Sequence, residues 1–232
     1  MANTKLFRRL DLWGPLSNAV KAMPHPRAGG PTHLRVFSGG CATGREPYSI
    51  AMLLEHYCYR HDFTVTATDV DPDLIAQART GVLTDGEVAR ALLREGILTR
   101  DMAERYLTRV DTATWQVKPR VLDRIDFTVA DLNAPAGLIP DPCHLAFCAN
   151  MWRHLNPDGR HALAAELGAT MPDYGLLVIG PSDLYFGEDP NDPTGPLLHR
   201  PEFTVDMQER FRPHPRHPLM YRPRTDRERP AA

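Results

Sequence analysis

Residues 34–49 read LRVFSGGCATGREPYS. The stretch opens with an apolar run typical of a buried strand and continues into a glycine-rich turn. The turn ends in an acid, Glu46, which begins a helical pattern of apolar residues over 46–60. Strand, glycine turn and helix in this order are typical of the ligand-binding end of an open α/β sheet. The residues around the turn indicate which class of ligand it binds.

The same alternation of apolar runs and helical patterns continues along the chain. Strands are predicted at 63–71, 124–132, 144–150 and 174–181, and helices at 72–80 and 157–171. An antiparallel pair of strands is predicted at 202–207 and 218–223. Strands that alternate with helices predict an α/β fold with a mostly parallel sheet and right-handed crossovers.

Residues 81–123 interrupt this alternation. Two short helical stretches lead into a β-ribbon with strands near 106–110 and 114–118, which predicts a small inserted helical and β-ribbon subdomain. Proline-rich stretches at 23–31 and 213–230 are interpreted as linker or tail. The predicted organisation is a short segment 1–33 that covers the ligand site, a catalytic domain 34–223 containing the insertion 81–123, and a flexible tail 224–232.

The composition excludes several classes of protein. The 232 residues carry a net charge of −2, which gives no electrostatic footprint for nucleic acid. The four cysteines form no CxxC pair, so neither a zinc site nor a disulfide framework is expected. No apolar window has the length of a membrane span, and the first residues lack a secretory h-region. The expectation is a cytoplasmic protein without a metal, a nucleic-acid partner or membrane insertion.

Acids at the strand ends narrow the choice of ligand. Asp69 ends the second strand, where nucleotide folds place a ribose-binding acid, and Asp131 ends the third, where it would accept from an adenine amino group. The turn has neither the GK[ST] ending of a P-loop nor a GxGxxG pattern. Glu46 beside the turn would repel a phosphate and suit a cation. These features together predict an adenosine ligand with positive charge, and S-adenosylmethionine has this chemistry.

Five stretches, in this order, resemble one known family: SGGCATGREPYSIAMLL, ATDVDPDLIAQARTG, FTVADLN, FCANMWRHL and YGLLVIGPSD. They are similar to the CheR methyltransferases, which esterify glutamates of chemotaxis receptors. The resemblance runs from about Thr4 to Tyr221, and its most specific part is GxEPYSIAM followed by ATDxD. It implies a Rossmann-like class I methyltransferase fold with S-adenosyl-L-methionine as cofactor.

The resemblance also implies site residues. The positions that match the family's cofactor-binding residues are Thr4, Arg8, Gly40, Thr43, Glu46, Asp69, Asp131, Leu132 and Asn150. Arg8 belongs to the stretch TKLFR, which is similar to the family's TxFFR, whose arginine reaches the methyl-transfer site. The insertion 81–123 resembles the family's β-subdomain, which docks the receptor in some members. It is therefore a candidate docking surface for a protein partner.

The departures from the family lie mainly on the substrate side. Ala149 stands where the family has an arginine, His154 where it has a tyrosine, and Asp131 where it has an asparagine. The family's GHSE motif is replaced by Gly-Pro-Ser-Asp at 180–183. Only 33 residues precede the first predicted strand, so most of the family's N-terminal helical domain has no counterpart there.

The predicted activity is S-adenosylmethionine-dependent O-methylation of a carboxylate on a small molecule, a peptide or a protein glutamate. Arg8 and His154 are the candidate catalytic residues. Arg8 would pair with the substrate carboxylate, and His154 would serve as a base for a hydroxyl or amine acceptor, unless it is a structural histidine at a helix end. Two alternatives stay open: an enzyme that consumes the aminocarboxypropyl arm of the cofactor and releases methylthioadenosine, and a non-catalytic module that senses the cofactor or docks a partner.

Overall fold

A computed structural model describes residues 4–8, 10–57, 62–95, 98–184 and 204–225. The chain divides into two compact units, residues 1–130 and residues 131–232. Within the described ranges, no helix is both long enough and apolar enough to cross a membrane.

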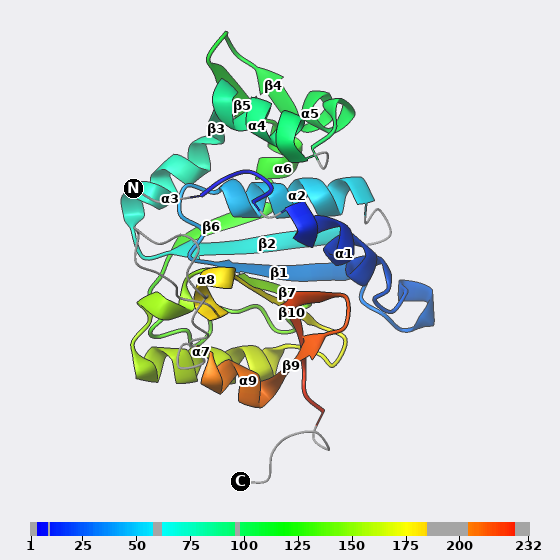
Figure 1. Cartoon of the computed structure of the whole chain (residues 1–232), viewed down its shortest axis with the longest axis vertical. Helices are drawn as coiled ribbons and strands as arrows, with labels where there is room; N and C mark the ends of the chain where they lie inside the picture. Colours follow the sequence, from blue (N-terminus) through cyan, green and yellow to red (C-terminus); the bar gives the residue numbers. More distant parts are fainter. Residues whose placement is uncertain (1–3, 9, 58–61, 96–97, 185–203, 226–232) are drawn as a thin grey trace, which may run out of the picture. The chain divides into compact units, whose positions relative to one another are not determined.

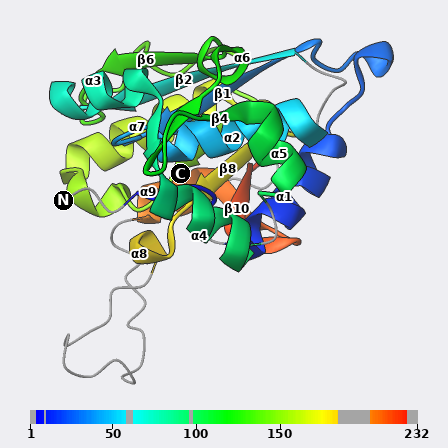
Figure 2. The same ribbon diagram turned by 90° about the horizontal axis from the view of Figure 1, so that it is seen from above.

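The first unit is built on three parallel strands in the order β6-β2-β1, which run side by side in Figure 2. They are β1 (His33–Gly39), β2 (Asp62–Asp69) and β6 (Ile125–Val129). The connecting helices are α2 (Arg45–Tyr57) and α3 (Pro72–Thr80). Val36 and Val65 are fully buried in the paired strands, and this burial explains why these apolar runs form strands and not helices.

The N-terminal segment contains the helix α1 (Leu10–Lys21), followed by the short 3-10 helix η1 (Pro26–Ala28). α1 was not predicted from the sequence. Its buried residues recur at helical spacing, namely Leu12, Trp13, Leu16, Ala19 and Val20, and α1 packs against α2. Gly14 and Pro15 inside the helix obscured this pattern, because both residues are poor helix formers.

The insertion forms a small antiparallel sheet in the order β3-β5-β4, with two helices beside it (Figure 1). Its elements are β3 (Val82–Thr84), α4 (Asp85–Glu95), α5 (Arg100–Tyr106), β4 (Leu107–Arg109), β5 (Thr114–Val117) and α6 (Pro119–Leu122). The predicted ribbon and both helical stretches are confirmed. The third strand, β3, was missed because three residues are too few to show a period-two pattern.

The second unit contains the parallel pair β7 (Leu145–Cys148) and β8 (Leu176–Ile179). Between them lie the 3-10 helix η2 (Trp152–His154) and α7 (Pro157–Thr170). The unit continues with α8 (Pro181–Leu184), α9 (Val205–Arg210), β9 (Phe211–His214) and β10 (His217–Pro223). β10 pairs antiparallel with both β8 and β9, and α9 packs against α7 (Figure 1).

Two predictions for the C-terminal region are wrong. The predicted strand at 202–207 is helical from Val205 onward, and the partner of the confirmed strand β10 is β9. The interpretation of 213–230 as linker or tail fails for 213–223, which lie in the β9–β10 hairpin. Pro213 is tolerated because β9 is an edge strand, where a missing N–H breaks no ladder hydrogen bond. The predicted α/β class and the mostly parallel pairing are confirmed.

Candidate functional site

The glycine turn between β1 and α2 depends on left-handed backbone conformations. Gly40, Ala42 and Gly44 have φ angles of 69°, 48° and 84°. A Cβ on Gly44 would lie 2.8 Å from the Tyr48 ring carbon Cζ, so only glycine fits there. Tyr48 itself is fully buried, its hydroxyl donates to the Ala78 carbonyl, and burial raises its pKa to about 12. The turn is therefore a fixed structure supported from α3.

Asp69, at the end of β2, contacts the glycine turn directly. Its Oδ2 accepts a hydrogen bond from the Ala42 backbone N–H at 2.8 Å, and its Oδ1 accepts one from the Asp71 N–H at 3.1 Å. Each carboxylate oxygen has a second lone pair, so both keep the capacity to accept from a ligand hydroxyl. The neighbouring Asp71 has a different role, because its side chain caps the N-terminus of α3.

Glu46 adds a second carboxylate beside the turn. Its Oε1 accepts a hydrogen bond from the Ser38 hydroxyl at 2.8 Å. The buried thiol of Cys41 lies in the turn, and its pKa is raised by burial and then by the negative charges of Asp69 and Glu46. The two carboxylates therefore make the turn electrostatically negative. This is the environment that a cationic ligand requires.

Arg45, which lies at the turn, was not predicted as a site residue. Its Nη1 donates to the carbonyl of Thr43 at 2.7 Å. The Arg45 side chain thus fixes the backbone of Thr43, one of the predicted cofactor-binding residues. The other partners of Arg45 are Val82 and Glu87, which lie about forty residues further along the chain. No local sequence pattern therefore identified Arg45 as a residue of the site.

The segment that contains Thr4 and Arg8 is docked on α2. The backbone N–H of Phe7 donates to the Ser49 hydroxyl at 2.8 Å, and the buried Phe7 ring contacts Trp13 edge-on at 5.2 Å between centroids. The Trp13 indole N–H donates to the Arg8 carbonyl at 3.0 Å. The first unit thus brings this segment and the glycine turn to the start of the same helix. The predicted roles of Thr4 and Arg8 in binding stay predictions.

In the second unit, Asp183 organises the loops after β7 and β8. Its fully buried carboxylate accepts hydrogen bonds from the backbone N–H groups of Asn150 at 2.5 Å, Gly180 at 3.0 Å and Trp152 at 3.1 Å. The Asn150 side-chain oxygen accepts from the Ser182 N–H at 3.2 Å. Asn150 has a left-handed φ of 61°. The acid that replaces the family's glutamate therefore fixes the backbone of a predicted cofactor-binding residue.

The remaining predicted residues also lie in the second unit. Asp131 is exposed, and its Oδ1 accepts from both the backbone N–H and the side-chain amide of Asn133, each at 2.9 Å. Leu132 is buried. His154 ends η2 with an exposed ring, whose Nε2 accepts from the Arg153 Nε at 3.1 Å. Catalysis by His154 stays a prediction.

Comparison with curated proteins gives partial matches to chemotaxis methyltransferases. The chain is 32% identical over 78 residues to the chemotaxis protein methyltransferase of Listeria monocytogenes, covering 34% of this chain and 29% of that protein. It is 35% identical over 83 residues to a probable chemotaxis protein methyltransferase of Rhizobium etli, covering 34% and 30% respectively. The aligned part thus spans less than a third of these relatives.

Solved structures with a similar chain course include a TehB-like SAM-dependent methyltransferase from Corynebacterium glutamicum. It shares 14% identity with a TM-score of 0.45, over 90% of this chain and 85% of that one. The glycopeptide N-methyltransferase MtfA in complex with S-adenosylmethionine shares 12% identity with a TM-score of 0.41, over 79% and 58%.

The family profile described as "CheR methyltransferase, SAM binding domain" matches residues 2–193, most of the chain. The match includes the glycine turn, the strand-end acids and the insertion. The chain belongs to the CheR methyltransferase family, and its cofactor is S-adenosylmethionine.

Proposed function

We propose that the chain transfers the methyl group of S-adenosylmethionine to a carboxylate oxygen of a small molecule, a peptide or a protein glutamate. The observation that carries the proposal is the contact between the glycine turn and the acid of β2, through the Ala42 N–H and Asp69 Oδ2. Both partners of this contact lie within residues 2–193, which the family profile matches.

The first unit fits this cofactor chemically. S-adenosylmethionine supplies an electrophilic methyl group on a sulfonium, and it also carries an ammonium group. Asp69 and Glu46 provide negative charge at the turn, and Asp69 is 8% exposed, so its charge is poorly screened by water. The left-handed Gly40 and Gly44 leave the turn without side chains at these positions. From the second unit, we propose Asp131, Leu132 and Asn150 as cofactor-binding residues because they match the family's positions.

Methylation of a carboxylate acceptor needs few catalytic groups from the protein. The carboxylate is ionised at neutral pH and needs no general base, so alignment of the reactants supplies most of the acceleration, worth about 7–11 kcal/mol in well-ordered sites. Arg8 is proposed to pair with the acceptor carboxylate, because a guanidinium binds such a group through two parallel hydrogen bonds. For a hydroxyl or amine acceptor, His154 is the proposed base, and its exposed ring is accessible to substrate.

The insertion is proposed to dock the acceptor when the acceptor is a protein. It exposes two valines: Val82 at the start of β3 is 42% exposed, and Val110, directly after β4, is 61% exposed. Exposed valines offer apolar contacts that cost little to desolvate. A protein acceptor is consistent with the names of the chemotaxis relatives.

Mass spectrometry of S-adenosylmethionine incubated with the purified chain, with and without cell extract, tests the activity. S-adenosylhomocysteine that appears only with extract, together with a product heavier by about 14 Da (one CH₂), supports the proposal. Methylthioadenosine formed without extract would instead show that the aminocarboxypropyl arm reacts. Tight cofactor binding without any turnover would leave a sensing module.

A pair of variants tests the site separately. Asp69→Ala is expected to abolish cofactor binding, because the turn loses its anchor and the ligand loses an acceptor. Asp71→Ala is the matched control, since Asp71 lies two residues away and caps α3 without touching the turn's Ala42. Retained affinity in Asp69→Ala would contradict the placement of the site.

A further inference from the structure

The C-terminal hairpin of the second unit brings arginines together. In the β9–β10 ladder, Arg212 stands directly opposite Arg222. Side chains directly opposite each other in an antiparallel pair project to the same face and lie within contact range. Arg216 occupies the two-residue turn that joins the strands. We refer to Arg212, Arg216 and Arg222 as the hairpin arginines.

The charges of the hairpin arginines act on one another. Burial lowers the pKa of Arg222, and the positive charges of Arg212 and Arg216 lower it further. His214, which is 5% exposed, has its pKa lowered by burial and then by Arg222, Arg216 and Arg212. All the charges that shift these two groups are positive. Like charges placed opposite each other in a ladder repel, and an anion bound between them would offset this repulsion.

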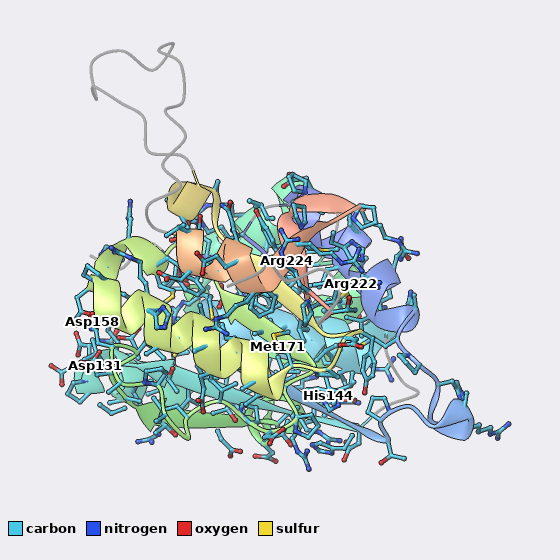
Figure 3. The ribbon with its side chains drawn as sticks, turned by 90° about the horizontal axis from the view of Figure 1, so that it is seen from below. Asp131, His144, Asp158, Met171, Arg222 and Arg224 are labelled. Atoms are coloured by element: carbon cyan, nitrogen blue, oxygen red, sulfur yellow. The ribbon has the colours of Figure 1, made fainter. Side chains whose placement is uncertain are left out.

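Arg222 gives the strongest indication of an anion site. Its Nε is buried and has no hydrogen-bond partner among the residues that the structure describes. A guanidinium N–H remains a donor on a charged group, so burying one without an acceptor is unfavourable. Arg224, two residues further along and labelled beside it in Figure 3, is different, because its Nε donates to the Gln208 carbonyl at 3.1 Å.

The hairpin arginines lie away from the residues of this unit that were assigned to the cofactor. β10 runs antiparallel to β8 and pairs Tyr221 with Leu177, near the first residue of β8. Arg222 therefore lies at the amino end of β8. Asn150 and Asp183 follow the carboxyl ends of β7 and β8. Methyl-transfer chemistry at the carboxyl ends does not account for arginines at the opposite end.

We propose that Arg212, Arg216 and Arg222 form a binding site for a phosphate group. Three guanidinium groups match the several negative oxygens of a phosphate better than the single charge of a carboxylate, and arginine binds phosphate oxygens in a bidentate manner. The site is independent of the proposed methyl transfer. A soluble phosphate ester and a phospholipid headgroup share this chemistry.

Calorimetry and thermal unfolding of the full chain with inorganic phosphate test the site, at an ionic strength held constant with chloride. Phosphate is expected to raise the midpoint of unfolding, because it binds the folded state alone. In Arg222→Gln the affinity for phosphate is expected to fall about tenfold, as for the loss of one charge-assisted hydrogen-bonding group. In Arg224→Gln, the matched control with its own protein partner, the affinity is expected to stay unchanged.

The unliganded proteins give a second readout. Without phosphate, Arg222→Gln is expected to be at least as stable as the parent chain, since it removes a repulsive charge. Should this variant fail to fold, the exposed Arg216→Gln replaces it and must weaken phosphate binding too. An unfolding midpoint that responds to phosphate no more than to chloride would overturn the proposal, as would unchanged affinity in the variants.

Vesicles distinguish the two sources of the phosphate group. Co-sedimentation with phosphatidylglycerol vesicles but not with phosphatidylcholine vesicles, lost in Arg222→Gln, would assign a lipid headgroup. Binding of glycerol 3-phosphate with no vesicle association would assign a soluble ester. Failure to bind inorganic phosphate, the ester and both vesicles would exclude the site.

Discussion

Arg45 and Glu87 form a bidentate ion pair that joins the glycine turn to the insertion. The Arg45 Nε lies 2.8 Å from Glu87 Oε1, and its Nη2 lies 3.1 Å from Oε2. Only 13% and 17% of the two side chains are exposed. The same guanidinium donates to the carbonyls of Thr43 in the turn and Val82 in β3. One side chain therefore links the proposed cofactor turn with the first strand and the first helix of the insertion.

Glu87→Gln is expected to weaken cofactor binding. Burial alone would raise the pKa of Glu87, but hydrogen bonds from Arg45 and from Thr84 outweigh it and lower the pKa. The pair is therefore ionised at neutral pH, and the neutral glutamine leaves the Arg45 charge without its partner. The expected loss is about 1–3 kcal/mol of stability with a several-fold rise in the dissociation constant for S-adenosylmethionine.

The control for this prediction lies on the same helix. Asp85 begins α4 and pairs with Arg109 and with the Trp115 indole, all within the insertion. Asp85→Asn is expected to leave cofactor affinity unchanged, as measured by calorimetry. Equal affinities in the Glu87 and Asp85 variants would show that the insertion does not act on the turn.

Gly44→Ala tests the geometry of the turn. The new Cβ would lie 2.8 Å from the Tyr48 ring, and the alanine would have to adopt a φ of 84°. The combined strain is expected to cost about 1–3 kcal/mol and to reduce cofactor affinity. Gly86→Ala on α4 is the control, because a Cβ there meets nothing within 4 Å. Its midpoint in urea should equal or exceed that of the parent, whereas an unchanged Gly44→Ala midpoint would show that the turn adapts.

Local signals explain which parts of the fold were predictable. α3 was predicted with its observed bounds, because local residues mark both of its ends. Asp71 caps the N-terminus and Pro72 occupies the first turn. Gly81 ends the helix with a left-handed φ of 67°. In the hairpin 211–223, the strand β10 was predicted but β9 was missed, because the prolines and arginines around β9 are typical of tails. The strands of the hairpin form because β10 pairs with β8, which lies about forty residues earlier in the chain.

The residues of the candidate site also include some that could be predicted from the sequence and some that could not. The contact between Asp69 and the turn follows from the rule that ligands meet the carboxyl ends of parallel strands, so both partners were identified from the sequence. Arg45 was not, because Glu87 lies 42 residues further along and only the folded insertion brings it close. Asp183 was recognised as a departure from a family motif, but its three backbone partners depend on loops that follow two separate strands.

Asp183 is expected to make stability depend on pH. Burial raises its pKa to about 7, although three backbone N–H donors oppose the shift. A folded pKa above the unfolded value means that the folded state binds the proton more tightly. The contribution to stability is therefore fully present below about pH 4 and is lost as pH rises through about 7, with a slope of at most about 1.4 kcal/mol per pH unit.

Urea unfolding of the parent and of Asp183→Asn at pH 5 and pH 8 measures this dependence. The variant should lose the pH dependence contributed by this group. It should also be less stable at pH 5, because an asparagine offers one oxygen to donors that now contact two. The exposed Asp173→Asn is the control and should follow the parent at both pH values. Parallel curves for the parent and Asp183→Asn would contradict the raised pKa.

Ser49→Ala tests whether the docked N-terminal segment contributes to methyl transfer. Ser49 is fully buried, and its hydroxyl accepts from the Phe7 N–H at 2.8 Å and donates to the Arg45 carbonyl at 2.7 Å. Removing it leaves the Phe7 N–H without an acceptor, at a cost of about 1–3 kcal/mol. If Arg8 holds the acceptor, loosening its neighbour should raise KM for the acceptor more than KM for S-adenosylmethionine. Ser17→Ala, a buried serine on α1, should leave both constants unchanged, and equal effects of the two variants would remove the N-terminal segment from the reaction.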